Sequence, residues 1–316
     1  MPEKITKDTI IRYLRSKYAF SEGRSMSTSV RESTQIAIEE YLFREGFLDK
    51  ERVISDKGIS FLHDNRLTES FKCEFSANGY EYTPDGNFDS EEIIKVLNSR
   101  PSPDYSLDHQ PLLTELTIMR AHYLASEENL FDKKVAFIGD YDCTHIALSL
   151  ITKVKELWVF DIDKRLIEFF QTIANKYQYN VNLVNCDLFE YDRSDVKGLF
   201  DVIVTDPPYA LGGMNYFVEF GIDLLKDGGR GYIAAPYHTS IDWTETMLFK
   251  IVELSLAKNC IVNSIFKYFH RYQTADGLQS SMIGIKKGVD LSLVNENKLY
   301  SYKKENINIP IFDINE

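Results

Sequence analysis

The chain lacks the features of a disulfide-stabilised, zinc-binding or membrane-spanning protein. Its cysteines lie far apart with no Cys-x-x-Cys pair, so neither a disulfide framework nor a zinc knuckle is expected. No apolar run reaches transmembrane length, and the first residues lead into a helical pattern rather than the apolar core of a signal peptide. The histidines show no metal-ligand spacing. We therefore expect a cytoplasmic protein without a membrane partner or a metal.

The chain also lacks an excess of basic residues, since it has 36 Lys and Arg against 48 Asp and Glu. Residues 1–66 are nearly neutral, with 12 basic and 11 acidic side chains, so the surplus negative charge lies beyond them. Surplus acid repels nucleic-acid phosphate and attracts cationic ligands. The charge argues against a nucleic-acid partner and points weakly to a cationic substrate, although an acidic surface can serve solubility alone.

The N-terminal part of the chain predicts a small helical module. Apolar residues recur at helical spacing over 5–17, and a second helix is predicted over 34–45. Residues 47–58 predict a strand and turn before a further short helix. This order resembles a winged helix, so we expect a winged-helix-like domain over 1–68 and a connector with a substrate-site loop over 69–112. Because no basic recognition face stands out, a homodimerisation or lid role is favoured over DNA binding.

Residues 113–316 show the pattern of an α/β catalytic domain. Strands are predicted at 135–138, 157–160, 181–184, 202–205, 232–235, 261–266 and 282–285. Helices are predicted at 113–126, 144–152, 164–176, 214–225 and 243–257. This alternation implies a mainly parallel sheet, and the last two strands, with no helix between them, predict an antiparallel hairpin. A seven-stranded sheet that ends in this way is typical of the class I methyltransferase-like Rossmann fold.

Glycine and acidic residues follow the first three predicted strands, at the sheet edge where open parallel sheets bind ligands. Gly139 permits a tight turn after the first strand, before a helix N-terminus with free N–H groups. Asp161 lies 22 residues further on, near the spacing at which an acid receives the ribose hydroxyls of adenosine. Asp187 is placed to meet the adenine amino group, with Leu188 stacked on the ring. Together these residues predict an adenosine pocket.

The fourth predicted strand ends in Asp206-Pro207-Pro208-Tyr209, the strongest local motif in the chain. The two prolines end the strand and hold the loop extended. The motif resembles the catalytic loop of methyltransferases that act on exocyclic or side-chain nitrogens, in which the acid receives the amine and an aromatic ring lies against it. We therefore expect Asp206 to act in catalysis and Pro207 and Tyr209 to contact the substrate. A rigid loop without chemistry is the alternative.

Asp140 and Asp142 stand where methyltransferases usually place glycines beside the donor's amino-acid tail. A carboxylate close to the donor's own carboxylate costs energy in a low-dielectric pocket. Decarboxylated S-adenosylmethionine ends in an ammonium instead, which these acids attract. The transferred group would then be aminopropyl, and a polyamine acceptor suits the same acidic pocket. The alternative is that one of the two acids only caps the next helix.

These motifs together resemble a known family, the archaeal and bacterial branched-chain polyamine synthases, which are aminopropyltransferases that build bis(aminopropyl)spermidine. The matching stretches, in order, are Arg100-Pro-Ser-Pro, Leu107-Asp-His-Gln, Gly139-Asp-Tyr-Asp-Cys-Thr-His-Ile-Ala-Leu, Phe160-Asp-Ile-Asp-Lys-Arg-Leu, Asp187-Leu and Phe200-Asp-Val-Ile-Val-Thr-Asp-Pro-Pro. The family's Gly-Asp-Asp-Asp signature implies donor and acceptor binding by Asp140 and catalysis by Asp142. Its Asp-Gln element implies that Asp108 and Gln110 approach the donor. Tyr141 replaces the middle acid of the signature and so removes one charge.

We therefore expect transfer of an aminopropyl group from decarboxylated S-adenosylmethionine to a polyamine amine, with release of methylthioadenosine. Asp142, with Asp206 nearby, is the expected acceptor of the amine proton. Two alternatives stay open. One is an N-methyltransferase that uses S-adenosylmethionine and acts on an amine or a nucleic-acid base, and the other is a nucleotide-sensing DNA-binding protein.

Overall fold

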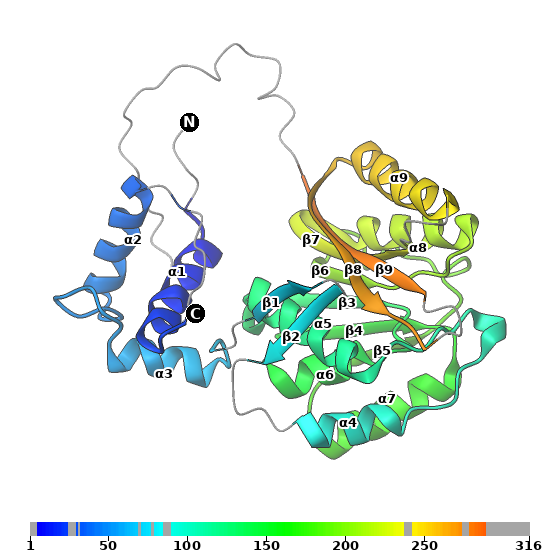
Figure 1. The fold of residues 1–316 in the computed structure, drawn as a ribbon, viewed down its shortest axis with the longest axis horizontal. Coiled ribbons are helices and arrows are strands. Elements are labelled where there is room, and N and C mark those ends of the chain that lie inside the picture. The colour runs from blue at the N-terminus through cyan, green and yellow to red at the C-terminus, as the bar shows by residue number, and fades with distance from the viewer. Residues whose placement is uncertain are drawn as a thin grey trace, which may run out of the picture. The chain divides into compact units, whose positions relative to one another are not determined.

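The computed structural model describes residues 5–24, 30, 32–68, 71–76, 79–84, 90–236, 242–273 and 278–288. These residues form two compact units (Figure 1). One unit holds residues 5–68 together with 125–129, and the other holds residues 71–124 and 130–288. None of the helices in these ranges is both long and apolar enough to cross a bilayer.

The first unit contains the helices α1 (Lys7–Ser21), α2 (Glu32–Arg44) and α3 (Asp56–Asp64). Thr6 caps α1 through a reciprocal capping box with Thr9. Between α2 and α3, where the sequence predicted a strand and turn, Leu48 and Ile54 form an isolated antiparallel bridge. The helices occur where they were expected. The winged-helix-like character of this unit and its dimerisation or lid role stay predictions.

The second unit is built on a seven-stranded sheet of the order β5-β4-β3-β6-β7-β9-β8. Its strands are β3 (Lys134–Ile138), β4 (Glu156–Asp161), β5 (Asn182–Asn185), β6 (Phe200–Thr205), β7 (Leu225–Pro236), β8 (Cys260–Arg271) and β9 (Gln279–Lys287). Strands β3 to β7 are parallel, and β9 runs antiparallel to both β7 and β8. The predicted class I methyltransferase-like sheet with a terminal hairpin is confirmed.

Helices cover both faces of this sheet (Figure 1). They are α5 (Thr114–Glu127), α6 (Thr144–Ile151), α7 (Lys164–Tyr177), α8 (Leu211–Leu224) and α9 (Asp242–Ala257). The chain moves from β3 outward to β4 and β5, then returns to β6 and continues to β7 on the other side. Because crossovers between parallel strands are right-handed, α6 and α7 lie on one face and α8 on the other, beside α9. This reversal between β3 and β6 places a crevice at their carboxyl ends.

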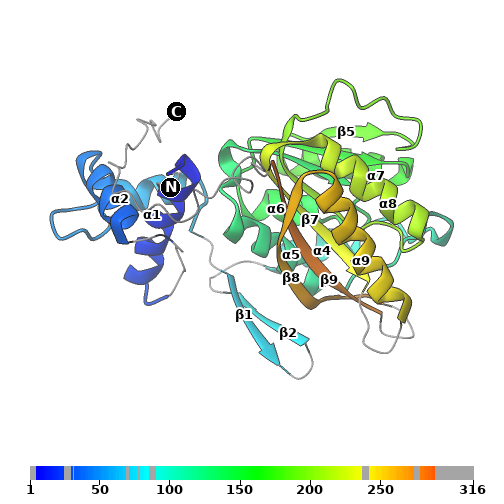
Figure 2. The ribbon, with the colours of Figure 1, turned by 90° about the horizontal axis from the view of Figure 1, so that it is seen from above.

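The connector contains a hairpin, which its turn residues allow, and a helix that the sequence did not predict. A hairpin of β1 (Phe71–Ser76) and β2 (Gly79–Pro84) lies beside β8 (Figure 2), and the helix α4 (Ser90–Asn98) follows. Ile93, Val96 and Leu97 of α4 are buried. Their spacing of three and four residues is the helical pattern. The sequence analysis did not predict α4 because the helix is short and follows a turn-rich stretch.

Candidate active site

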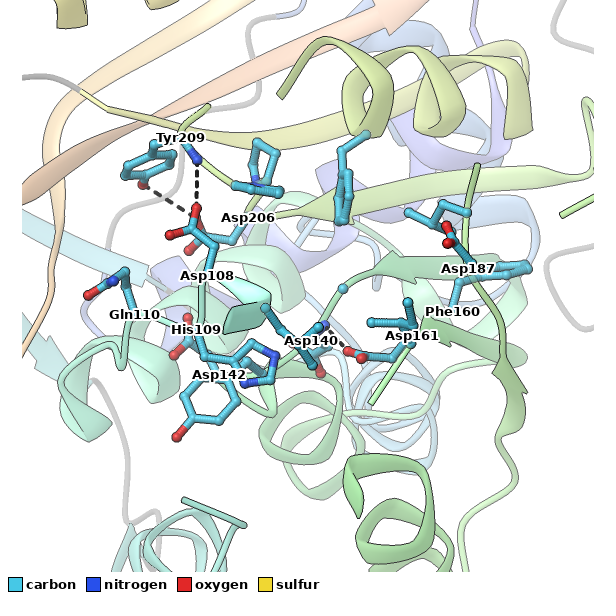
Figure 3. Close-up of a pocket in the computed structure, with 18 of the residues that line it drawn as sticks. Asp108, His109, Gln110, Asp140, Asp142, Phe160, Asp161, Asp187, Asp206 and Tyr209 are labelled. Atoms are coloured by element: carbon cyan, nitrogen blue, oxygen red, sulfur yellow. Dashed lines mark hydrogen bonds between the residues drawn. The ribbon is translucent and has the colours of Figure 1, made fainter. Parts of the chain in front are cut away.

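A cavity of about 360 Å³ lies at the carboxyl ends of β3, β4, β5 and β6 (Figure 3). Each predicted site residue lines it, namely Asp108, Gln110, Gly139, Asp140, Asp142, Asp161, Asp187, Leu188, Asp206, Pro207 and Tyr209. Arg120, Phe217 and Tyr272 also line it and were not predicted. The sheet thus gathers residues from loops that are far apart in the sequence. The roles assigned to the individual residues stay predictions.

The turn after β3 is shaped by Gly139 and Asp140. Gly139 has φ of 64°, and a Cβ at this position would lie 3.1 Å from the ring of Phe217, so a side chain there would be both strained and crowded. The Asp140 carboxylate accepts the N–H groups of Thr144 at 2.9 Å and His145 at 3.0 Å, and lies 2.6 Å from His145 Nδ1. Asp140 therefore caps α6, which is the role that the sequence analysis gave as the alternative for one of the two acids.

Asp161 faces the cavity from the end of β4. Its two carboxylate oxygens accept the backbone N–H groups of Asp140 at 3.1 Å and Asp163 at 2.9 Å. Burial raises the pKa of Asp161 to about 6, although these hydrogen bonds oppose the rise. Asp163 points away to cap α7 and to bind Arg165. Each Asp161 oxygen can accept further hydrogen bonds, so the side chain is suited to receive a diol.

The far end of the cavity is formed by the residues after β5. Asp187 accepts the N–H of Phe189 at 2.9 Å. The Leu188 side chain is only 6% exposed and belongs to the hydrophobic core, so little of its surface is open for stacking. Phe189 is 62% exposed and stacks on Tyr216 with a centroid distance of 4.0 Å, and Ile162 is 49% exposed. Phe189 and Ile162 both line the cavity, and each offers more exposed apolar surface to a base than Leu188 does.

Asp206 stands at the opposite end, where Pro207 ends strand β6. Its carboxylate accepts from Arg120 Nη2 at 2.9 Å and from the Tyr272 hydroxyl at 2.8 Å. The Tyr209 hydroxyl lies 3.3 Å from it and 2.6 Å from the Tyr272 hydroxyl. Burial, together with the Asp206 charge, raises the pKa of both tyrosines well above the usual value, so both hydroxyls keep their protons. The surroundings of Asp206 thus consist of donors.

Asp142 is 5% exposed and has fewer partners. Its Oδ1 accepts the backbone N–H of Leu112 at 2.9 Å, and its Oδ2 lies 3.7 Å from Arg120 Nη2. Burial raises the pKa of Asp142 to about 6, with Arg120 opposing the rise and the Asp206 charge adding to it. A carboxylate with a raised pKa on a cavity wall is suited to accept a proton.

Arg120 connects the two acids and was missed by sequence reasoning. The residue lies in the middle of α5 and is buried. All three of its nitrogens meet protein acceptors, with Nε donating to His270 at 3.0 Å, Nη1 to Thr144 at 3.4 Å and Nη2 to Asp206 at 2.9 Å. Burial disfavours its charge, but Asp206 and Asp142 outweigh burial and raise its pKa. A charged residue within the apolar face of a predicted helix is the signal that could have identified it.

Tyr141, which replaces an acid of the family signature, connects the turn after β3 to the segment 100–110 through three contacts. Its ring stacks on His109 with a centroid distance of 4.3 Å. The Arg100 guanidinium lies 4.9 Å from the centroid of the same Tyr141 ring. The Tyr141 hydroxyl donates to the carbonyl of Pro101 at 3.3 Å. Asp108 in the same segment accepts the N–H of Tyr209 at 3.1 Å (Figure 3). The segment is thereby held over the cavity.

The described residues that line the cavity include six aspartates and one arginine. Because the charge of that arginine is shared by Asp142 and Asp206, the cavity favours a cationic ligand. No cluster of three or more metal-ligating side chains is found in the described ranges.

The doubly wound sheet with its terminal antiparallel hairpin defines a protein of the class I methyltransferase-like fold. The family model for the branched-chain polyamine synthase A C-terminal domain matches residues 90–308. This chain belongs to that family.

Known relatives agree with this assignment. The chain is 32% identical over 186 residues to an N(4)-bis(aminopropyl)spermidine synthase of Methanocaldococcus jannaschii, and 30% identical over 186 residues to one of Thermococcus kodakarensis. Each match covers 58% of this chain and 52% of the relative, so the chain spans about half the length of the curated relatives it matches.

A solved structure shares the fold. It is the branched-chain polyamine synthase from Thermus thermophilus in complex with N4-aminopropylspermidine and 5′-methylthioadenosine. The TM-score is 0.56 at 17% identity, and the match covers 88% of this chain and 86% of that one.

Proposed function

We propose that this chain is an aminopropyltransferase that moves an aminopropyl group from decarboxylated S-adenosylmethionine to an amine of a polyamine and releases methylthioadenosine. Membership of the branched-chain polyamine synthase family supports the reaction. The names of the relatives and the molecules bound in the Thermus structure support a polyamine acceptor and a donor that leaves methylthioadenosine.

The protein contacts of Arg120 are the observation that favours the decarboxylated donor. S-adenosylmethionine ends in a carboxylate, which needs a cation or several N–H groups in a buried site. Arg120 is the arginine on the described cavity wall, and its charge is already shared by Asp206 at 2.9 Å and Asp142 at 3.7 Å, while Nε and Nη1 donate to His270 and Thr144. The decarboxylated donor carries an ammonium in place of the carboxylate, and the remaining aspartates suit it.

The proposed chemistry is an in-line displacement at the carbon beside the sulfonium. The amine nitrogen forms the new C–N bond, the C–S bond breaks, and its electron pair stays on the sulfur of methylthioadenosine. Most of the acceleration comes from holding nitrogen, carbon and sulfur collinear. Asp142 takes the proton of the attacking amine, because its pKa of about 6 lies nearer the working range than that of an ordinary carboxyl.

In this proposal the nucleotide lies between the acids that follow β3, β4 and β5. Asp161 receives the ribose hydroxyls, and Asp187 meets the adenine amino group. Asp108, Gln110 and Asp140 lie at the donor's tail, with Asp140 acting partly through the cap it gives α6. Pro207 and Tyr209 border the acceptor amine.

The test is incubation of the protein with decarboxylated S-adenosylmethionine and polyamines of graded length, with products identified by mass spectrometry. We expect aminopropylated polyamine and methylthioadenosine in equal amounts. Asp206→Asn should abolish the products. Asp195→Asn removes the same charge from an exposed position outside the cavity and should leave them unchanged.

Isothermal calorimetry with the two donors separates this proposal from its alternatives. We expect at least about tenfold tighter binding of the decarboxylated donor, a difference of about 1.4 kcal/mol. Tighter binding of S-adenosylmethionine, together with a methylated amine as product, would replace aminopropyl transfer by methyl transfer. We expect no mobility shift with sheared DNA, and a salt-sensitive shift would support a DNA-binding role instead.

A cytoplasmic location and homodimerisation through the N-terminal unit remain part of the proposal.

A further inference from the structure

His270 lies behind the cavity, is fully buried and is not among the lining residues. Its Nε2 lies 3.0 Å from Arg120 Nε, which donates to it. An arginine nitrogen can only donate, so His270 Nε2 must be the acceptor and carries no hydrogen. A neutral imidazole in this position therefore keeps its hydrogen on Nδ1. Burial and the charge of Arg120 lower the pKa of His270 well below the usual value, which agrees with a neutral ring.

Ser280 receives this hydrogen. It is fully buried on β9, directly opposite His270 on β8, and its Oγ lies 2.8 Å from His270 Nδ1. The same oxygen lies 3.0 Å from the hydroxyl of Tyr272. Because Nδ1–H already donates to Oγ, the Ser280 hydroxyl is left to donate to the Tyr272 oxygen.

Tyr272 completes the series. Its hydroxyl lies 2.8 Å and 3.0 Å from the two oxygens of Asp206, and 2.6 Å from the hydroxyl of Tyr209. With its oxygen accepting from Ser280 and from the Tyr209 hydroxyl, Tyr272 donates its own hydrogen to Asp206. The hydrogen bonds from His270 through Ser280 and Tyr272 then all point towards Asp206. A reversed chain would need a hydrogen on His270 Nε2, which faces the Arg120 donor.

We propose that His270 and Ser280 are positioning residues that fix the direction of this hydrogen-bond chain, so that Asp206 stays a carboxylate that holds the cationic acceptor while Asp142 alone takes the amine proton. The groups that face Asp206 are Arg120 from α5, Tyr209 from its own loop, Tyr272 from the end of β8 and the charge of Asp142. The inference rests on the proposed function for the identity of the acceptor. It assigns the amine proton to Asp142 and the binding of the cationic acceptor to Asp206, which the sequence had placed near the proton transfer.

The first test is the tautomer of His270, measured by ¹⁵N–¹H correlation NMR on protein with labelled histidine. His270→Asn identifies the signals by their loss. We expect a protonated Nδ1, an unprotonated Nε2 and no titration between pH 5.5 and pH 8. A hydrogen on Nε2, or titration within this range, would overturn the proposed direction. This measurement does not depend on enzymatic activity.

The second test is the kinetics of Ser280→Ala, which interrupts the chain without touching the cavity. We expect the KM for the polyamine to rise about three- to tenfold, as for one weakened hydrogen bond to a charged group, with kcat within about twofold. Ser280→Thr keeps a hydroxyl and should restore part of the polyamine KM. The affinity for methylthioadenosine should not change in either variant, which also reports that each is folded.

Ser281→Ala is the matched control. Ser281 is also fully buried on β9, but its Oγ makes no hydrogen bond to the described residues, so the polyamine KM should stay at the wild-type value. An unchanged polyamine KM in Ser280→Ala, with methylthioadenosine binding intact, would overturn the positioning role. A wild-type protein that transfers no aminopropyl group would instead contradict the proposed function, and the tautomer measurement would then decide the inference by itself.

Discussion

Arg120 Nη2 lies 2.9 Å from Asp206 Oδ2, and the two side chains are only 3% and 16% exposed. The same nitrogen lies 3.7 Å from Asp142. One buried cation from α5 is therefore shared by carboxylates that follow β3 and β6, the two central strands at which the chain reverses its direction through the sheet. The pair compensates part of the cavity's negative charge and leaves the rest for a ligand.

Arg120→Gln should destabilise the protein strongly, because it leaves two buried carboxylates without their cation. We expect a loss of about 3–5 kcal/mol in the free energy of unfolding, measured by urea denaturation. Arg120→Lys keeps the charge but cannot reach three acceptors, so its loss should be smaller. Lys250→Gln breaks an exposed ion pair with Glu253 and should change stability by less than about 0.5 kcal/mol. Equal losses in Arg120→Gln and Lys250→Gln would contradict this account.

Asp142→Asn should lower kcat by about 100-fold or more, because the amide cannot accept the amine proton. The affinity for methylthioadenosine should stay within about threefold, since the carboxylate is not assigned to the nucleotide. In the wild type, kcat should fall as the pH drops through about 6, where Asp142 becomes protonated. Steady-state kinetics over pH 5–9 checks both. Unchanged turnover in the variant would remove Asp142 from the reaction.

The same substitution should stabilise the protein without ligand at neutral pH. The native carboxyl of Asp142 has a pKa of about 6, against about 3.9 in an unfolded chain. Below pH 4 the group is protonated in both states, whereas above pH 6 its buried charge weakens the native state. Asp142→Asn should therefore gain on the order of 1–3 kcal/mol at pH 7, and the gain should fade as the pH falls from 6 to 4. Thermal unfolding at several pH values measures this, and a gain independent of pH would argue against a buried charge.

Asp161→Asn should weaken methylthioadenosine binding by about 10- to 100-fold, as expected for losing a charged acceptor of two hydroxyl donors. Asp163→Asn is its control, because Asp163 lies two residues away but caps α7 and binds Arg165. That variant keeps an N-cap oxygen and loses only the charge beside Arg165, so its stability should fall by less than about 1 kcal/mol and its affinity should stay within about threefold. Calorimetry on both variants gives the comparison, and an equal loss of affinity would place the ribose elsewhere.

Tyr141→Ala should weaken binding of the donor by about tenfold, because it removes the ring that stacks on His109 and holds the segment 100–110. Tyr141→Phe keeps the ring and loses one hydrogen bond of 3.3 Å to the Pro101 carbonyl, so its effect should stay within about twofold. Fluorescence or calorimetric titration with the donor separates the two. If both variants bound the donor like the wild type, Tyr141 would have no part in holding the segment.

Much of the fold could be predicted because the signals are local. The strands β3 to β7 and the helices between them follow from apolar runs and periodicity within about 15 residues. Strand β8 extends beyond its predicted end because pairing with β9 continues to Arg271, and strand β7 begins before its predicted start, where Leu225 pairs with Phe200 of β6. Helix α4 was not predicted because it is short, although its buried residues have the helical spacing.

The sequence by itself determined which loops form the site, because the loops that follow parallel strands lie at the same edge of the sheet. Gly139, Asp161, Asp187 and Asp206 could therefore be placed in one cavity. Only the tertiary structure decided that Asp140 caps α6 and that Arg120 compensates Asp206. Arg120 and Asp206 are 86 residues apart, and no periodicity in the sequence predicts a hydrogen bond between residues so far apart. It depends on how the helix packs against the sheet, which no local pattern encodes.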